Sequence, residues 1–278
     1  MAAVTIITPF RDAARFLPGL VENLRLQTMP HWHCLLIDHG SLDQGAALAE
    51  KLIRDDPRFR LLRLSARLGF DRQLPAIPRN HGLSEVETPL VAFLDVDDLW
   101  HPQKLERQLA FHQQHELDLS VTSFCCFREA NQTLGPWRCP PARVRRSDLR
   151  WRNPIPMLTV IANTSLLSEG FPLHPHEDYL LWLELWRDRP GLRYGCLPEL
   201  LAFYRLHDHN LSRQPRQLVR WTYGVYRAFG TPPPQALVFL LRWGCAHLWQ
   251  RVLDRLRSPH TLNSLAALME QHPLAWGH

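Results

Sequence analysis

The chain has 278 residues, of which 45% are hydrophobic and 21% charged, and its net charge at pH 7 is +5. This composition is that of a globular protein, with no low-complexity tract. No apolar run reaches the ~18 residues of a membrane-spanning helix. No secretory signal precedes the first predicted strand. We therefore expect a cytoplasmic protein that does not cross a membrane.

The positive charge is concentrated near the C-terminus. From residue 213 onward there are eight arginines and two acids, Asp254 and Glu270, whereas residues 1–212 carry 24 basic and 25 acidic residues. A second basic stretch covers residues 138–152. Such patches indicate either a solvated face or binding of anionic lipid or phosphate.

In the first third of the chain, apolar strand-like runs alternate with helical patterns. Strands are expected at residues 4–8, 33–38, 59–64 and 90–94, and the first should stop at Pro9. Helices are expected at 13–27, 46–54 and within 72–86. This alternation predicts an α/β fold with a mainly parallel central sheet and helices on both faces.

The rest of the chain is less regular. We expect a helix at 102–115, a strand at 120–127, a Pro/Arg-rich break at 135–156, and a helix that begins near Glu177. A strand and a polar loop follow, and the remainder is helical and split by Pro232, Pro233 and Pro234. We predict two units, residues 1–212 and a basic, Trp/Arg-rich helical extension at 213–278.

The stretch FLDVDDLW, residues 93–100, places three carboxylates directly after a predicted strand. In an extended backbone Asp95 and Asp97 would share a face. Two hard oxygen ligands on one side suit Mg²⁺ or Mn²⁺, and Asp98 is expected to cap the next helix. The alternative is a polar strand end with an acidic cap and no metal.

Several predicted strands end in residues that could line one crevice. Pro9, Asp38 and Asp95 each follow an apolar run, and ligands of parallel sheets bind beyond the carboxyl ends of the strands. No GxGxxG follows the first strand, which argues against a dinucleotide site. Glu177 and Asp178 stand at a predicted helix start, where the helix dipole alone could account for them.

Six segments, in order, resemble family 2 glycosyltransferases, which use nucleotide sugars on a GT-A fold. They are VTIITPF, LRLQTMPHWHCLLIDHGSLD, PRNHGL, PLVAFLDVDDLWHPQKLERQ, HEDYLLWLEL and LAFYRLHDHNLSR. The later segment RWTYGVYRAFG is similar to members that build bacterial surface polysaccharides. The match covers roughly residues 4–230.

The resemblance implies roles at nine positions. Residues expected to contact the nucleotide sugar are Pro9, Phe10, Asp38, Arg79 and Asp95, with Arg79 approaching the diphosphate.

The remaining positions concern the metal and the acceptor. Asp97 would bind Mn²⁺ or Mg²⁺, and His207 could contact the metal or the diphosphate. Asp178 would be the general base, assisted by Glu177. A cation and an arginine neutralise a leaving diphosphate. A single base opposite the leaving group implies inversion at the anomeric carbon.

Two departures from the family pattern bear on the nucleotide. His39 stands where a second Asp usually contacts the base, and a neutral imidazole can still donate or accept a hydrogen bond. Arg11 and Asp12 replace the usual Tyr and Asn. Arg11 could meet a phosphate or pair with Asp12. UDP is therefore not singled out from other nucleotides.

The leading hypothesis is an inverting, metal-dependent glycosyltransferase that acts on a glycan or lipid-linked acceptor in a cell-surface polysaccharide pathway. One alternative is a haloacid dehalogenase-type phosphohydrolase, whose acidic motif normally follows the first strand rather than the fourth. Another is a degenerate glycosyltransferase fold that acts as a binding module. Nucleic-acid binding is disfavoured because no recognition motif is present.

The predicted helix after Pro234 carries apolar residues, including Leu237, Leu248 and Trp249, with arginines beside them. It would either pack on the catalytic domain or lie in a membrane interface. We therefore expect a protein of the cytoplasm. A peripheral contact with the inner face of the cell membrane is left open.

Overall fold

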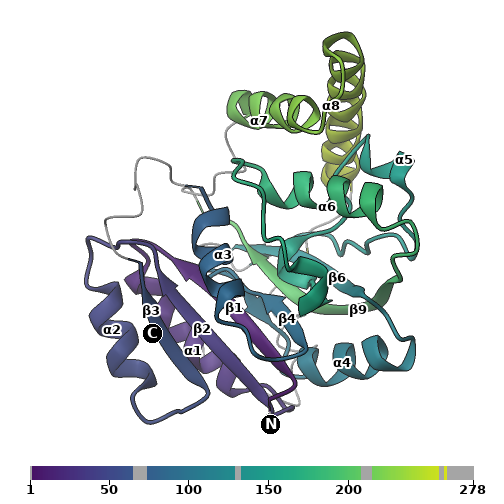
Figure 1. The fold of residues 1–278 in the computed structure, drawn as a ribbon. Coiled ribbons are helices and arrows are strands. Elements are labelled where there is room, and N and C mark those ends of the chain that lie inside the picture. The colour runs from purple at the N-terminus through teal and green to yellow at the C-terminus, as the bar shows by residue number, and fades with distance from the viewer. Residues whose placement is uncertain (1, 65–73, 129–132, 208–214, 257–259, 262–278) are drawn as a thin grey trace.

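The structure is a computed structural model that describes residues 2–64, 74–128, 133–207, 215–256 and 260–261. Ten strands form one curled sheet (Figure 1). The strands are β1 Val4–Phe10, β2 Trp32–Asp38, β3 Phe59–Arg63, β4 Leu90–Phe93, β5 Leu99–Trp100, β6 Leu119–Arg128, β7 Thr133–Leu134, β8 Ile161–Asn163, β9 Tyr194–Arg205 and β10 His260–Thr261.

Eight α-helices and three short 3₁₀ helices accompany these strands in the described part of the chain. The α-helices are α1 Leu17–Arg25, α2 Gly45–Ile53, α3 Ala76–Ser84, α4 Lys104–Gln114, α5 Arg146–Leu149, α6 Glu177–Asp188, α7 Pro215–Ala228 and α8 Pro233–Leu256. The 3₁₀ helices are Ala14–Phe16, Met157–Thr159 and Thr164–Leu167.

The strand order is β10-β7-β6-β8-β4-β1-β2-β3, and β9 pairs with β5 and β6. Strands β4, β1, β2 and β3 are mutually parallel, and β9 runs parallel to β6. Strand β8 is antiparallel to both β4 and β6. The predicted α/β class with a largely parallel centre is therefore confirmed.

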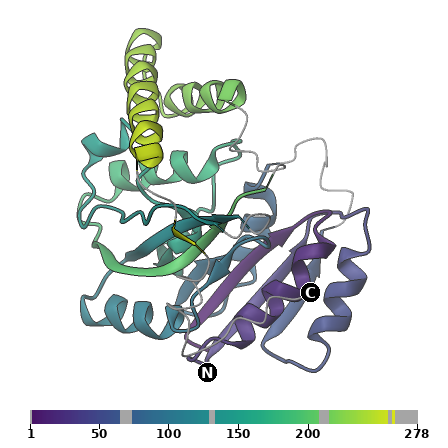
Figure 2. The same cartoon turned by 180° about the vertical axis from the view of Figure 1, so that it is seen from behind.

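Both faces of the central strands are buried, which explains their continuous apolar runs. Along β1, Ile6 belongs to the core that packs with α1 and α2, whereas Ile7 belongs to the core that packs with α3 and α6. Figures 1 and 2 show these two helical layers from opposite sides.

Gly82 allows α3 to approach the sheet closely. A Cβ at this position would lie 2.6 Å from Ile37 Cδ1 and 2.9 Å from Ile7 Cγ2. Only glycine therefore fits without displacing the core. The glycine of the PRNHGL segment therefore determines how closely α3 packs on the sheet, and with it the position of Arg79.

The sequence led us to expect that the first strand stops at Pro9, and this prediction is wrong. Strand β1 continues to Phe10, and Pro9 pairs in register with Ile37 of β2. On its other side β4 reaches only as far as Ile7. Pro9 thus has a strand neighbour on one side only, where a missing N–H is tolerated.

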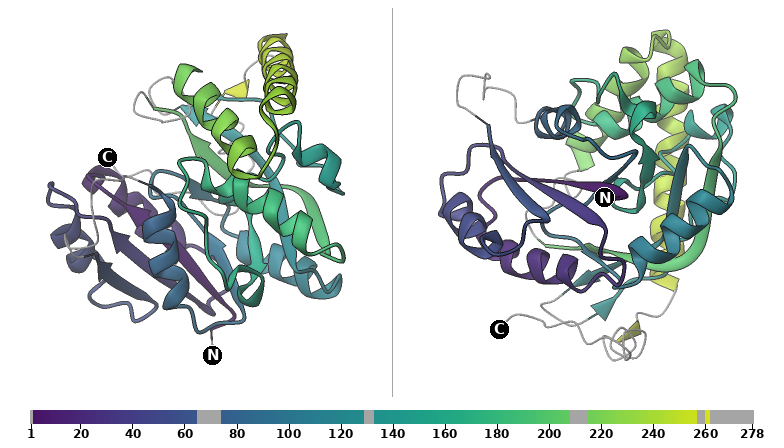
Figure 3. Two further views of the ribbon diagram at one scale, coloured as in Figure 1. Left: turned by 45° about the horizontal axis from the view of Figure 1, so that its top comes forward. Right: turned by 60° about the horizontal axis from the view of Figure 1, so that its bottom comes forward.

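The helices α7 and α8 cover α6 on the side away from the sheet (Figure 3). Tyr226 of α7 hydrogen-bonds Tyr179 of α6, with 3.2 Å between the hydroxyl oxygens, and Ala236 of α8 is fully buried. Within the described residues no helix has the length and apolarity to cross a bilayer. The predicted helix split at Pro232–Pro234 is confirmed; residues 262–278 lie outside the described chain.

Candidate active site

The carboxyl ends of β1, β2 and β4 bring the predicted donor residues to one edge of the sheet. Phe10 and Asp38 are partners in the β1–β2 register and end their strands together. Asp95 follows β4 by two residues, and Leu94 N donates to Ile7 O across 3.2 Å. The structure therefore brings these predicted residues to the same edge of the sheet.

The acidic segment forms a turn rather than a continued strand. Strand β4 ends at Phe93, and Asp98 N donates to Asp95 O across 3.0 Å. The expected extended backbone at Asp95 and Asp97 is therefore wrong. The turn directs the three carboxylates to different partners instead of placing two of them side by side on one face.

Asp97 and His207, two residues that the resemblance associates with the metal site, lie in contact. Asp97 Oδ2 lies 2.7 Å from His207 Nε2, and each side chain is about one-fifth exposed. Burial, followed by the charge of Asp95, raises the pKa of Asp97, while His207 opposes that rise. Positive charge placed beside this carboxylate would therefore be stabilised.

Asp98 is not a helix cap. Helix α4 begins only at Lys104, and Asp98 Oδ1 accepts from Arg205 N across 2.9 Å. The side chain is 1% exposed, and burial followed by the charge of Asp97 raises its pKa well above the usual range. Asp98 thus ties the acidic turn to β9.

Arg205 holds the same turn and was not predicted as a site residue. Its Nε donates to Asp97 O across 2.5 Å, and its guanidinium lies 4.7 Å from the ring centre of Phe127. Because Arg205 and His207 are two residues apart, the end of β9 positions both groups against Asp97. The sequence signal that could have identified Arg205 is its position in the segment LAFYRLHDHNLSR, two residues before His207.

Arg79 lies between two carboxylates from distant parts of the chain. Its Nη2 donates to Asp95 Oδ1 across 2.7 Å, and its Nη1 donates to Glu177 Oε1. Arg79 is 6% exposed and Glu177 is 3% exposed. Burial lowers the pKa of Arg79, but Asp95 and Glu177 outweigh burial and raise it overall. The guanidinium therefore remains charged and joins the donor side to α6.

Glu177 has an unusual proton affinity. Burial raises its pKa from 4.5 to about 7, Arg79 opposes the rise, and Asp178 adds to it. Two carboxylates share one guanidinium here, so the cluster retains a negative charge unless one of them is protonated.

Asn80 fixes the segment that leads into α6. Its Nδ2 donates to Phe171 O across 2.8 Å, and its Oδ1 accepts from Phe171 N across 2.6 Å. Gly170 has a φ of +75°, and a Cβ there would lie 2.8 Å from Asn80 Oδ1. The PRNHGL segment thus positions α6 as well as Arg79.

Asp178 stands at the start of α6, as predicted. Its Oδ2 accepts from Asn153 Nδ2 across 2.8 Å, and its Oδ1 accepts from Tyr179 N across 2.7 Å. The side chain is 20% exposed, so its carboxylate is accessible from solvent. Asn153 comes from the irregular Pro/Arg-rich stretch, where no sequence pattern indicated a role.

The residues after β1 and β2 form a hydrogen-bonded rim. Asp38 Oδ1 accepts from Ser41 N across 2.9 Å, and Asp12, with a φ of +49°, accepts from Leu42 N across 2.6 Å. Burial, followed by the charge of Arg11, lowers the pKa of His39. A neutral imidazole therefore replaces the usual carboxylate at this rim.

Asp97 and His207 offer an oxygen and a nitrogen donor, which suits Mn²⁺ or Mg²⁺. The described residues contain no group of three or more His, Cys, Asp or Glu side chains that could hold an ion. Divalent ions on nucleotides usually take one or two protein ligands and complete their shell with phosphate and water. The pair fits that kind of site.

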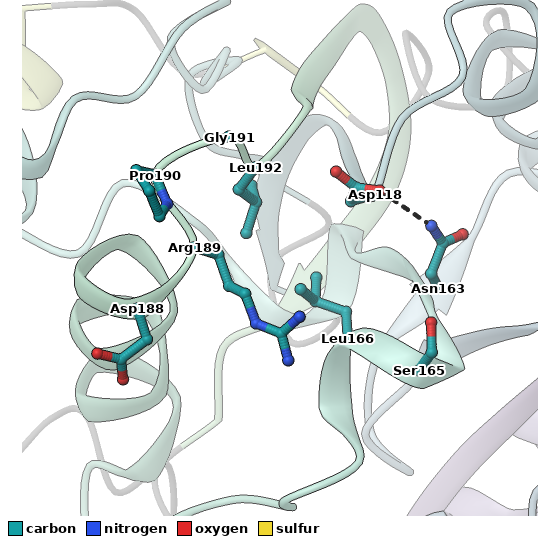
Figure 4. Close-up of a pocket in the computed structure, with 9 residues that line it drawn as sticks. All are labelled: Asp118, Asn163, Ser165, Leu166, Asp188, Arg189, Pro190, Gly191 and Leu192. Atoms are coloured by element: carbon teal, nitrogen blue, oxygen red, sulfur yellow. Dashed lines mark hydrogen bonds between the residues drawn. The ribbon is translucent and has the colours of Figure 1, made fainter.

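A surface pocket of about 410 Å³ lies at the opposite edge of the sheet (Figure 4). Its lining includes Asp118, Asn163 and Arg189. Asn163 pairs in register with Leu90, the first residue of β4, so this pocket is at the amino end of that strand. It contains none of the predicted site residues.

Comparison with known proteins gives a consistent result. The family described as Glycosyl transferase family 2 matches residues 5–154. A putative teichuronic acid biosynthesis glycosyltransferase, TuaG of Bacillus subtilis, is 27% identical over 81% of this chain and 87% of its own. The Escherichia coli protein WfgD, a UDP-Glc:alpha-D-GlcNAc-diphosphoundecaprenol beta-1,3-glucosyltransferase, is 26% identical over 86% of this chain and 91% of its own.

Solved structures share the fold. The S. aureus TarS fragment in complex with UDP-GlcNAc has a TM-score of 0.66 at 18% identity, over 87% of this chain and 71% of that one. The mannosyltransferase PcManGT from Pyrobaculum calidifontis, in complex with GDP-Man and Mn²⁺, has a TM-score of 0.63 at 17% identity, over 99% of this chain and 81% of that one.

Proposed function

Because the chain belongs to glycosyl transferase family 2, we propose that it moves a sugar from a nucleoside-diphosphate sugar to a hydroxyl of a glycan or lipid-linked acceptor, with inversion at the anomeric carbon. Family membership favours a glycosyltransferase over the phosphohydrolase and binding-module alternatives. The proposed setting is bacterial cell-surface polysaccharide synthesis, since TuaG is named for teichuronic acid biosynthesis and WfgD for transfer to a diphosphoundecaprenol-linked sugar.

One observation carries the proposal. Asp38, Asp95 and Asp97 lie at the carboxyl edge of the sheet, and Arg79 joins Asp95 to the start of α6, where Asp178 stands. A donor-binding edge and a candidate base are thereby linked through a single buried side chain. An inverting transfer needs such an arrangement, with the base facing the anomeric carbon opposite the leaving group.

The donor side is proposed to work by position and charge. The rim at Phe10 and Asp38 would take the nucleoside. Asp97 and His207 would hold Mn²⁺ or Mg²⁺, which when bound neutralises the charge that develops on the leaving diphosphate. Arg79 donates hydrogen bonds to Asp95 and Glu177. We therefore propose that it orients Asp95 toward the donor and does not bind the diphosphate directly.

The acceptor side is proposed to depend on Asp178 as the general base. It would accept the proton of the attacking hydroxyl, and Asn153 would hold its carboxylate in orientation. Glu177 would act as a positioning residue, because its carboxylate is buried against Arg79. The nucleoside of the donor is left unassigned, since TarS is solved with UDP-GlcNAc and PcManGT with GDP-Man.

We propose that the chain divides at residue 212. Residues 1–212 would form the GT-A unit that carries out the chemistry, and residues 213–278 would have a separate role. We also propose that the protein works in the cytoplasm, where nucleotide sugars are available, at the inner face of the cell membrane.

The test replaces the proposed base. Asp178→Asn should lower transfer by about 10²- to 10⁴-fold, the usual contribution of a general base, and leave donor binding unchanged. Transfer is measured with a nucleotide-sugar panel, and the product anomer is assigned by NMR. The control is Asp188→Asn at the far end of α6, which pairs with Arg187 at the surface. Normal turnover of Asp178→Asn would refute its assignment as the base. A product that keeps the anomeric configuration of the donor would refute inversion.

A further inference from the structure

One face of α8 exposes a continuous row of apolar side chains. Leu241 is 71% exposed, Trp249 65% and Leu248 63%. We call the full row the α8 stripe; it consists of Leu237, Val238, Leu241, Cys245, Leu248, Trp249 and Val252, all exposed. At about 100° per residue these seven positions cover an arc of about 120° on the helix.

The opposite face of α8 holds the helix to the protein. Phe239 meets Trp151 edge-on with 5.1 Å between ring centres, and it also packs on Tyr226. The guanidinium of Arg242 lies 3.8 Å from the ring centre of Trp151. The α8 stripe therefore points away from the face that is anchored, and the packing of the described residues on the catalytic unit leaves the stripe exposed.

The two last helices carry the whole net charge of the chain. Residues 215–256 contain six arginines and one acid, Asp254, which gives +5, while the other 26 basic and 26 acidic residues of the chain cancel. Arg216, Arg220 and Arg227 are exposed on α7, and their spacing places them within about 40° of one another on that helix.

We propose that α7 and α8 dock on an anionic lipid bilayer, with the α8 stripe inserted among the headgroups and the arginines attracted to their negative charge. An apolar helical face accompanied by arginines is the pattern of interfacial helices. Tryptophan favours the boundary between headgroups and acyl chains. This inference deepens the proposed location at the membrane by naming the surface that binds lipid, and it can be tested apart from transfer, because binding to lipid requires no donor.

A second copy of the chain fits the stripe less well. A two-fold dimer through α8 would bring two +5 surfaces together, with Asp254 as the only acid in either helix pair. Anionic lipid supplies the opposite charge. It would also place α6, on which α7 packs, close to a membrane surface where lipid-linked acceptors reside.

The first test is flotation of the full chain with vesicles. We expect binding to vesicles of phosphatidylcholine with phosphatidylglycerol, little binding to pure phosphatidylcholine, and release from the anionic vesicles at high salt. Failure to float with the anionic vesicles would overturn the proposal, and so would equal binding to both compositions.

The second test changes the α8 stripe. The double variant Leu241→Glu/Leu248→Glu should bind anionic vesicles at least about tenfold more weakly, because two inserted side chains become charged. Trp137→Glu, on an exposed side chain outside the helices, should bind as the wild type does. Equal loss in both variants, or no loss in the double variant, would contradict the proposed surface.

A charge variant keeps the proposal testable if the double variant fails to fold, which circular dichroism would reveal. Arg216→Gln/Arg220→Gln alters only exposed α7 side chains and should weaken binding to anionic vesicles about tenfold. Undiminished binding would remove the electrostatic part of the proposal.

Two measurements separate this inference from its competitors. Sedimentation velocity without lipid should give the same species for the wild type and the double variant. A wild-type dimer that the double variant dissociates would assign the stripe to self-association and overturn lipid docking. Turnover with a water-soluble acceptor should be unchanged in the double variant, so that lost lipid binding and a failed transferase proposal remain distinguishable.

Discussion

The two edges of the central sheet hold their charged groups under different conditions. At the carboxyl edge, Arg79 and Glu177 are almost completely buried, and each depends on a partner far away in the sequence. At the amino edge, Asp118 pairs with Arg193, whose side chain is 52% exposed.

Burying charge is costly unless each group finds a partner. A surface pair can be lost at little cost. The carboxyl edge therefore carries charges that packing alone would not favour, and their retention there points to chemistry. The pocket at the amino edge has the volume of a ligand site but none of this electrostatic arrangement.

Arg79→Met should give the largest effect on stability. It leaves Glu177 buried without its cation, and at pH 8, above the Glu177 pKa of about 7, breaking a buried pair from one side costs about 3–5 kcal/mol. The free energy of unfolding, measured in urea, should fall by that amount. In the double variant Arg79→Met/Glu177→Gln part of the loss should return, because the unpaired charge is gone. A double variant no more stable than Arg79→Met would show that Glu177 is not charged against Arg79.

Glu177→Gln should change how stability depends on pH. The pKa of Glu177 is about 7 in the folded chain against an ordinary value of 4.5. Between these values the folded state binds more protons than the unfolded state, so the stabilising effect of the raised pKa is complete below pH 4.5 and is lost as pH rises to 7. The loss is about 3 kcal/mol.

In the variant the contribution of Glu177 to that decline should disappear from unfolding curves recorded across this pH range, while Asp97 and Asp98, whose pKa values are also raised, keep theirs. Glu199→Gln, which removes one partner of a surface pair with Arg107, should keep it. A Glu177→Gln protein with the same dependence of stability on pH as the wild type would contradict the raised pKa of Glu177.

Asp118→Asn should have the smallest effect. Asp118 contacts Asn163 and Arg193 at the amino edge, and its side chain is 26% exposed. We expect a loss of about 1 kcal/mol or less in unfolding free energy, with transfer activity unchanged. Impaired transfer in a stably folded Asp118→Asn protein would mean that the amino-edge pocket takes part in function.

Much of the fold could be predicted from the sequence, because strands buried on both faces leave continuous apolar runs. The resemblance singled out Asp97 and His207 as candidate metal residues, and the structure brings these two side chains into contact. The acidic turn was harder, because an alternating Asp-x-Asp pattern does not reveal that the strand ends at Phe93.

The partners of the buried charges could not be predicted. Arg79 and Glu177 are 98 positions apart, and their contact depends on Gly82 and Asn80 placing α3 and α6. Asn153 lies in a segment without periodicity, so only the folded chain shows that it holds Asp178. Local patterns identify strands and helices, whereas charge partners arise from tertiary packing.

The central claim is that the carboxyl edge binds a nucleotide sugar through Asp97. Isothermal titration of a nucleotide-sugar panel, with Mn²⁺ and with chelator, tests it directly in the wild type, Asp97→Ala and Asp118→Asn. We expect at least one donor to bind the wild type and Asp118→Asn in Mn²⁺ only, and none to bind Asp97→Ala. Unchanged binding to Asp97→Ala, or equal binding with chelator, would contradict the account.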